Sequence, residues 1–459
     1  MVTSMMPTAM PVLVALGLLL AAMPATVAWT DEPWPGNGEE SSTQAESDDW
    51  ANDDWDDDDW DDDWDDPWGT DSAGLSWSGF VEGGLGARWD SVDNLDRLTL
   101  GDLRLRAETR YDHDAFRIDF RGDLAWDQVV EDLDIQLREL AISFTTMGNV
   151  DAKLGRQVIT WGTGDLLFLN DLFPKDFISF FAGRDEDYLK SPTDTARISI
   201  YTAPVNIDLA YTPRFTPDDY LYGERFVFWN PALGEAAAPA DPRRADEPSS
   251  GELALRLFRR VGATELALYG YRGRWKQPLG TDAAGLPRFP RLQSWGASVR
   301  TPVHKGIFNA EAAYYDSRDD SRGEDPRTPN SELRLLAGYE QELVRNLTAG
   351  TQLYAERIMN HDRLVANSPD PEHERDQWRT VGTVRLTYRA MQDTLTSSLF
   401  MFVSPSDEDF YLRPSIAWRR DDQWLFSAGL NIFGGSDPHT FFGQLEDNSN
   451  GWLRVRYYY

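Results

Sequence analysis

Apolar and polar residues alternate with a period of two along most of the chain from Trp77 onward. In "LRLRAETRY", Leu103 and Leu105 fall on one face, whereas Arg104 and Arg106 fall on the other. The segment "FRIDFRGDLAW" repeats the pattern after the short connection "DHDA". Such alternation indicates β-strands with one apolar and one charged face, joined in antiparallel hairpins.

The same pattern predicts eighteen strands in all. A soluble β-sandwich also alternates, but continuous alternation to the end of the chain, aromatic residues near strand ends, and short turns opposite longer loops are typical of membrane barrels. We expect long loops between the first and second, third and fourth, and fifth and sixth strands. The sequence therefore predicts an all-β fold, a transmembrane antiparallel β-barrel of 16–18 strands covering residues 75–459. The predicted strands are 77–89, 98–111, 115–126, 134–145, 150–160, 195–203, 205–212, 252–260, 264–274, 291–301, 306–316, 332–341, 346–358, 377–389, 394–403, 410–420, 424–433 and 450–459.

The last residues, "WLRVRYYY", place Leu453 and Val455 on one face and Arg454 and Arg456 on the other, and they end on an aromatic residue. This ending resembles the C-terminal assembly signature of Gram-negative outer-membrane barrels. The resemblance implies two partners, outer-membrane lipid and the barrel assembly machinery.

The N-terminus predicts export. Residues 1–28 contain the apolar run "MPVLVALGLLLAAMPATVA", which ends in small residues and reads as a signal peptide, although no Lys or Arg precedes it. A single membrane anchor is the alternative, but the run is short for a spanning helix. No later apolar stretch is long enough to form one, and the chain has no Cys for disulfides.

Residues 29–74 form a strongly acidic segment. Between residues 31 and 71 there are 19 Asp or Glu and no Lys or Arg, and the whole chain has a net charge of −33. Such a charge block predicts a disordered tail, here periplasmic, and argues against nucleic acid as a partner. Three interpretations stay open: a spacer, a plug that enters the lumen, and a docking peptide for a periplasmic protein. In the last, the inserted side chains would be Trp50, Trp55, Trp60, Trp64 and Trp68.

The polar faces of the first three strands and of the last strand carry most of the predicted lumen charge. In a closed barrel these strands are neighbours, so their side chains form a ladder along one wall. The ladder either attracts an anionic or polyhydroxylated solute or is simply a charge-paired wall. The candidate pore-lining residues are Arg88, Arg104, Arg106, Arg110, Arg117, Arg121, Arg454, Arg456, Asp119 and Asp123.

The connection from Trp161 to about Asp194 is far more apolar than a solvated loop. Its apolar side chains need burial, which the barrel lumen would provide. Together with "LGRQ" and the following "WG", it resembles porin-like outer-membrane proteins in which an inward-folded third loop narrows the channel, and more distantly alginate-export-type barrels. A structural plug or lid is the alternative. By this resemblance the constriction candidates are Arg156, Gln157, Trp161, Asp165, Asp171, Lys175 and Asp176.

The sequence shows no nucleophile elbow, no phosphate-binding loop and no metal-ligand spacing among its five His, so we expect no enzymatic activity, cofactor or metal site. The function we expect is an outer-membrane, porin-like channel for passive or facilitated passage of small hydrophilic solutes, including anions. The alternative is a non-conducting outer-membrane component of a trans-envelope transport assembly, docked through the acidic Trp-rich tail.

Overall fold

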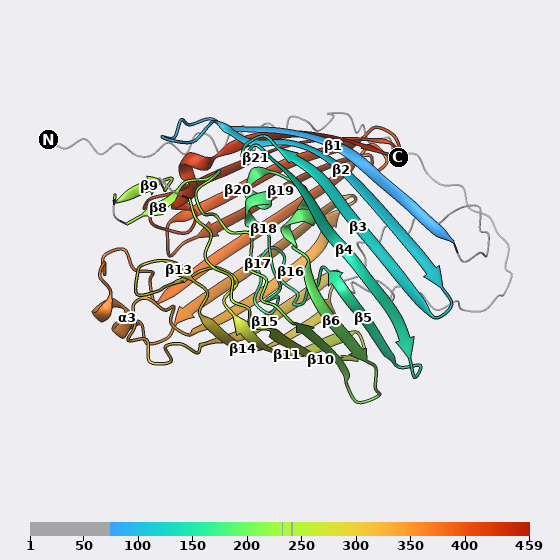
Figure 1. The fold of residues 1–459 in the computed structure, drawn as a ribbon, viewed down its shortest axis with the longest axis horizontal. Coiled ribbons are helices and arrows are strands. Elements are labelled where there is room, and N and C mark those ends of the chain that lie inside the picture. Colours follow the sequence, from blue (N-terminus) through green and yellow to red (C-terminus); the bar gives the residue numbers. More distant parts are fainter. Residues whose placement is uncertain (1–73, 232, 240–241) are drawn as a thin grey trace, which may run out of the picture. The chain divides into compact units, whose positions relative to one another are not determined.

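A computed structural model describes residues 74–231, 233–239 and 242–459 of the chain. Within these ranges, eighteen strands form one antiparallel sheet that closes through pairing of β1 with β22 (Figure 1). All eighteen strands predicted from the period-two pattern are present, so the barrel prediction is confirmed. Their bounds are β1 Leu75–Arg88, β2 Leu98–His113, β3 Phe116–Asp127, β4 Asp132–Thr146, β5 Val150–Gln157, β6 Thr193–Ile200, β7 Asn206–Thr212, β10 Glu252–Val261, β11 Thr264–Arg274, β14 Arg291–Val303, β15 Gly306–Ser317, β16 Glu332–Val344, β17 Leu347–Ile358, β18 Trp378–Ala390, β19 Leu395–Ser404, β20 Asp409–Arg419, β21 Trp424–Gly435 and β22 Asn450–Tyr458.

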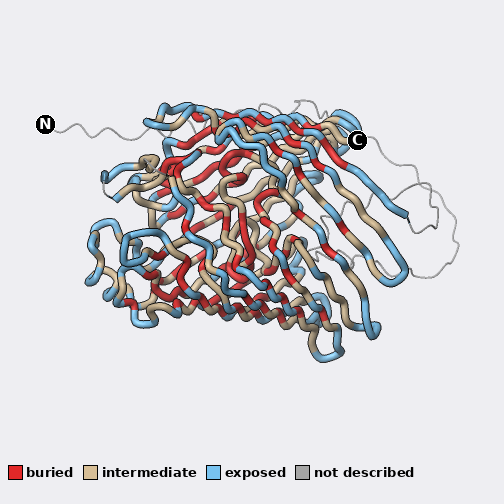
Figure 2. Tube along the Cα trace, viewed as in Figure 1, coloured by how far each residue is buried: buried red, intermediate tan, exposed pale blue. Residues whose placement is uncertain are grey.

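The strands present an apolar face outward and a polar face inward. On β2, Leu103 is 58% exposed, whereas the adjacent Arg104 is 2% exposed. Figure 2 shows the same alternation of buried and exposed residues along neighbouring strands. Because a closed sheet leaves no unpaired backbone edge, an outward apolar belt on such a sheet suits the hydrocarbon of an outer membrane.

Short turns join the strands at one end of the barrel, and the longer connections lie at the other. One expectation is wrong: the connection between β3 and β4 is not long but comprises only residues 128–131. The Asp127 side chain accepts a hydrogen bond from the Val129 N–H at 3.0 Å, which closes this connection into a tight turn.

Two of the long connections matter for function. We call residues 158–192, between β5 and β6, loop L3; it contains helix α2 (Phe177–Ala182) and the 3₁₀ turn η1 (Glu186–Leu189). We call residues 213–251, between β7 and β10, loop L4; it contains the short strands β8 (Phe228–Asn230) and β9 (Glu235–Ala237). The remaining small elements lie in other long loops: β12 Gly280–Thr281, β13 Pro287–Arg288, α3 His361–Asn367 and η2 Gly443–Asn448. No helix in the described ranges has the length and apolar character needed to cross a membrane.

The main apolar cluster is inside the barrel and is built around L3. Leu169 and Phe180 of L3 are buried together with the wall residues Tyr315 and Tyr411. The expectation that the apolar loop folds into the lumen is therefore confirmed.

Candidate constriction in the lumen

The first leg of L3 crosses the lumen to β15. There the Glu311 carboxylate accepts hydrogen bonds from the backbone N–H groups of Thr163 and Gly164, the latter at 2.9 Å. The Asn170 amide donates to the other carboxylate oxygen of Glu311 at 2.6 Å. One buried wall carboxylate thus holds two points of the leg, and it offsets the cost of burying these loop donors.

The same leg then reaches β17 and β18. The Gln352 side chain accepts from the Asp165 N–H and donates to the Asp165 carbonyl, both at 2.8 Å. Arg385 binds the Asp165 carboxylate with two hydrogen bonds, of 2.6 and 2.9 Å. A bidentate pair of this kind fixes the orientation of the Asp165 carboxylate and also compensates its charge.

Helix α2 seats L3 against β20 and β21 by apolar packing. The ring of Phe181 lies 5.8 Å from that of Tyr411 and 5.4 Å from that of Phe433, centroid to centroid. Asn431 donates to the Phe181 carbonyl at 2.9 Å, which satisfies a helix-end acceptor. The helix ends at Ala182 and is capped by Gly183, whose left-handed φ of 89° and contact with the Trp452 ring leave no room for a side chain.

After Gly183, the second leg of L3 is bound mainly through charge. The Arg184 guanidinium donates to Asp102 at 2.5 Å and to Asp127 at 2.7 Å. The next residue, Asp185, lies 2.8 Å from Arg454 and 3.0 Å from Arg456, measured between carboxylate oxygen and guanidinium nitrogen. Burial alone would raise the pKa of Asp185, but these two arginines outweigh it and hold the pKa well below its usual value.

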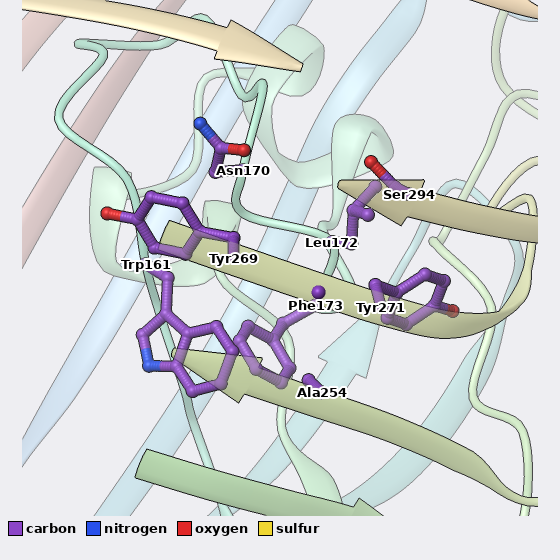
Figure 3. Close-up of a pocket in the computed structure, with 9 residues that line it drawn as sticks. Trp161, Asn170, Leu172, Phe173, Ala254, Tyr269, Tyr271 and Ser294 are labelled. Atoms are coloured by element: carbon purple, nitrogen blue, oxygen red, sulfur yellow. The ribbon is translucent and has the colours of Figure 1, made fainter. Parts of the chain in front are cut away.

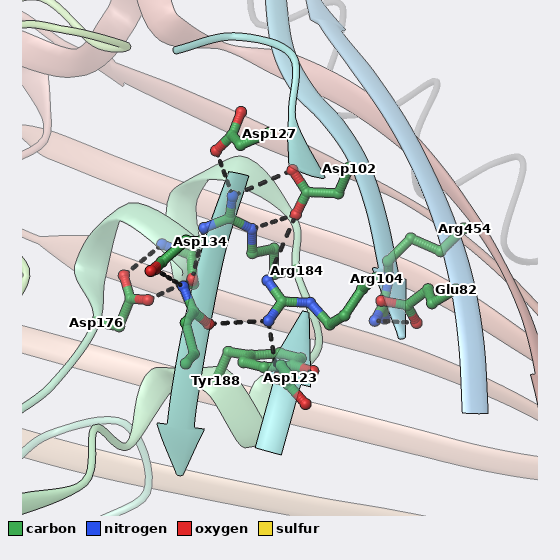
Figure 4. A network of polar contacts seen from close by, with 12 residues as sticks. Glu82, Asp102, Arg104, Asp123, Asp127, Asp134, Asp176, Arg184, Tyr188 and Arg454 are labelled. Carbon is green, nitrogen blue, oxygen red and sulfur yellow. Dashed lines mark hydrogen bonds and ion pairs between the residues drawn. The ribbon is translucent and has the colours of Figure 1, made fainter. Parts of the chain in front are cut away.

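Tyr188 of η1 meets the charged wall of β2 and β3 (Figure 4). Arg106 donates to the Tyr188 hydroxyl at 2.7 Å, and the hydroxyl donates to Asp123 at 3.0 Å. Asp123 in turn lies 2.8 Å from Arg104 and 2.7 Å from Arg106. These predicted ladder residues therefore lie together, as a buried group in which two arginines share one carboxylate, and the group touches L3.

The other ladder candidates lie outside this group. Towards the short-turn end, Arg110 pairs with Asp119 at 3.0 Å and Arg121 pairs with Glu108 at 3.0 Å. Arg117 pairs with Asp112 at the exposed rim, at 2.8 Å. At the long-loop end, Arg88 is buried and donates to the backbone carbonyl of Arg225 in L4.

Two constriction candidates belong to β5 rather than to L3. Arg156 pairs in register with Leu140, which is exposed on the outer face, and its guanidinium lies 3.3 Å from Asp194. Because side chains alternate across a strand, Arg156 shares the outward face, and a role at the constriction does not fit this position. Gln157 is buried and donates to the Thr195 carbonyl at 3.0 Å.

The remaining candidates lie within L3. The Trp161 ring packs edge-on against Phe173, 5.0 Å between centroids, beside Tyr269 and Tyr271 of the wall (Figure 3). Asp171 and Lys175 form a buried ion pair of 2.8 Å inside the loop. Asp165 binds the wall and Asp176 caps α2, accepting from the Ser179 N–H at 2.7 Å.

L3 and L4 are joined at a small junction of backbone hydrogen bonds. The Phe177 N–H donates to the Asp219 carbonyl at 3.0 Å, and the Asp219 N–H donates to the Lys175 carbonyl at 2.8 Å. Burial raises the pKa of Asp218 to about 7, although the Lys175 N–H, Lys175 and Lys276 favour its charged form. Burial, and then the charge of Asp219, raise the pKa of Asp176 to about 6. The junction thus holds acids that titrate near neutral pH.

Several groups that hold L3 were not among the residues predicted from the sequence. On the loop these are Arg184, Asp185, Glu186 and Tyr188; on the wall they are Glu311, Arg385 and Arg413. The run "RDED", a few residues before the sixth strand, was the available signal, because carboxylates that are buried in a lumen require cationic partners. In the described ranges, no three His, Asp or Glu side chains are grouped closely enough to hold a metal ion.

Comparisons with known proteins bear on the fold. No protein-family model matches the sequence, and neither does any curated protein. Acinetobacter baumannii OccAB3 superposes with a TM-score of 0.50 at 11% identity, over 84% of this chain and 100% of that one. Pseudomonas aeruginosa OccK3 (OpdO) gives 0.50 at 10% identity, over 84% and 95%. The A. baumannii outer membrane channel DcaP is more distant, at 0.41 and 10% identity, over 84% and 97%.

At these identities the likeness concerns the fold. The closed sheet of eighteen strands, its outward apolar belt and its inward-folded third loop define the class: a porin-like outer-membrane β-barrel.

Proposed function

We propose that this protein is an outer-membrane channel for small hydrophilic solutes, including anions, and that L3 forms its constriction. Barrels of this strand number have a lumen wide enough for an aqueous path. The observation that carries the proposal is the ionic contact between the second leg of L3 and the lumen wall, where Asp185 meets Arg454 and Arg456. Arginines at a narrow point are groups that select for anions.

Conductance of the purified protein in planar bilayers tests this proposal. We expect stepwise currents, with a reversal potential that indicates anion preference under a KCl gradient. Folding is checked independently by the mobility change that a closed barrel shows on an SDS gel after boiling. A folded barrel that never conducts would contradict the proposal.

A second function is favoured by the dense packing of L3, whose Leu169, Phe180 and Phe181 are buried against the wall. According to this second proposal, the barrel is the non-conducting outer-membrane part of a trans-envelope assembly and docks through its acidic tail. The docking candidates Trp50, Trp55, Trp60, Trp64 and Trp68 lie outside the described residues. This function requires that the barrel conducts no current in planar bilayers. It also requires that a periplasmic protein binds the isolated tail but does not bind a tail in which these Trp are replaced by Ser.

A further inference from the structure

Four arginines of the lumen wall converge on two adjacent carboxylates of L3. We call them the arginine quartet: Arg385 on β18, Arg413 on β20, and Arg454 and Arg456 on β22. Arg454 and Arg456 bind Asp185 at 2.8 and 3.0 Å. Arg413 binds one carboxylate oxygen of Glu186, and Arg385 lies 3.5 Å from the other. Each carboxylate is thus held by two arginines.

The quartet is positioned largely by the barrel and not by L3. The guanidinium of Arg456 lies 4.1 Å above the Phe80 ring, that of Arg385 lies 4.7 Å above Phe400, and that of Arg454 lies 4.9 Å above Trp452. All three rings belong to barrel strands, so these stacks persist when L3 moves. Only Arg413 stacks on a loop residue, Phe180, at 4.4 Å.

Two guanidinium groups of the quartet also have N–H donors that bind no acceptor among the described residues. The Nε atoms of Arg413 and Arg454 are buried without a hydrogen-bond partner among the described residues, and both side chains are at least nine-tenths buried. A buried, unused guanidinium N–H costs free energy unless an acceptor reaches it. The site therefore offers more donors than Asp185 and Glu186 use.

Charge balance shows what could take the place of the two carboxylates. Asp165 neutralises part of the quartet through Arg385, and Glu82 does so through Arg456 at 2.8 Å. Removal of Asp185 and Glu186 would leave two positive charges without partners in a largely buried place, which is strongly unfavourable. A neutral solute cannot restore the balance and a monoanion restores half of it, whereas a dianion restores all of it.

We infer that Asp185 and Glu186 are resident occupants of a binding site for solutes that carry two carboxylates, and that such a solute opens the constriction by replacing them. The inference rests on the proposed channel function, and it names the solute class and the step that admits the solute. The exchange is one carboxylate for another at each pair of arginines. It frees Asp185 and Glu186 from the lumen wall without exposing the apolar side chains of α2.

Succinate binding to the detergent-solubilised, full-length protein tests the site, with calorimetry as the readout. In the double variant Asp185→Asn, Glu186→Gln the internal competitors are neutral but similar in shape. We expect it to bind succinate about tenfold more tightly than the unaltered protein, because one charge-assisted hydrogen bond is worth about that factor. Asp114→Asn is the control for the loss of an acidic side chain, because Asp114 is exposed in the turn between β2 and β3, at the end of the barrel away from the long loops. We expect it to leave the affinity unchanged.

A second measurement uses the unaltered protein and does not depend on the folding of any variant. Succinate should accelerate amide hydrogen exchange across residues 184–190, whereas the neutral analogue succinamide should not. The inference is overturned if succinate leaves this exchange unchanged, if succinamide acts equally, or if the double variant binds succinate no better. KCl currents that persist in any of these cases would leave the channel proposal standing. A folded barrel without currents would refute the channel, while succinate binding in solution would still decide the site.

Discussion

Replacing Asp218 with Asn should remove most of the pH sensitivity of the L3–L4 junction. Asp218 is 5% exposed and accepts a hydrogen bond from the Lys175 N–H at 2.9 Å. Lys175, Lys276 and Asp219 are the charged groups that act on it. Asn preserves the acceptor oxygen and the shape but cannot ionise, so the hydrogen bond persists while the titration disappears.

The size of the effect follows from the pKa of Asp218, which lies at about 7 in the folded protein against an ordinary value of 3.8. Because the folded-state pKa is raised, the stabilising contribution is fully present at acid pH and is lost as the pH rises through the folded pKa. Between about pH 5.5 and about pH 7.5 the free energy of opening the junction should fall by about 2 kcal/mol, an upper limit that corresponds to roughly 25-fold more frequent opening. Asp176, with a pKa of about 6, acts in the same direction.

Hydrogen exchange followed by mass spectrometry measures this opening directly. After correction for the intrinsic pH dependence of exchange, segments 174–191 and 213–222 should lose protection as the pH rises in the unaltered protein. They should lose much less in Asp218→Asn, where Asp176 still titrates but Asp218 no longer does. Asp246→Asn, an exposed position of the same loop, should respond like the unaltered protein. Equal loss of protection in Asp218→Asn and the unaltered protein would refute this account.

Two further substitutions test how L3 and the charged wall are held. Gly183→Ala should displace L3 from the wall, because a Cβ at this position, where φ is 89°, would lie 2.2 Å from the Trp452 side chain. Protease cleavage of L3 should therefore increase. Gly148→Ala is the control: Gly148 also has a positive φ but has open space around it, so cleavage should be unchanged. Asp123→Ala should destabilise the barrel by about 3–5 kcal/mol, because it removes the carboxylate that pairs with buried Arg104 and Arg106. The readout is a lower temperature of unfolding in SDS. Removal of Asp112 from its exposed pair with Arg117 should cost less than about 1 kcal/mol, and equal effects of the two changes would contradict this interpretation.

The strands could be predicted because a membrane barrel imposes its chemistry locally. Each strand needs an apolar face for lipid and tolerates charge on the other, so the two-residue period survives even in short segments such as β6 and β7. The connection between β3 and β4 was mistaken because the Asp127 side chain closes it into a tight turn, and that contact depends on geometry that the alternation does not encode.

The contacts of L3 could not be predicted in the same way. Asp185 and Arg454 are 269 positions apart, and Asp165 and Arg385 are 220 positions apart. The alternation places Arg379, Arg385 and Arg389 on the same face of β18, so it did not indicate which of them meets the loop. The sequence located the loop and its need for burial, but which wall residues receive it depends on the path of the loop across the lumen.

The two parts of L3 differ in how they can move, and this difference reconciles a well-packed loop with solute passage. Lifting α2 would expose Phe180 and Phe181, which are 5% and 6% exposed, so apolar burial opposes its movement. Arg184 of the second leg binds Asp102 and Asp127, and Tyr188 and Leu189 are buried, so these residues also resist movement. Asp185 and Glu186, by contrast, are held by ion pairs with Arg413, Arg454 and Arg456. An incoming anion can replace such pairs one at a time while each guanidinium keeps a partner. We therefore expect passage to require displacement of Asp185 and Glu186 while α2 stays seated, and a gap that opens first at α2 would contradict this division.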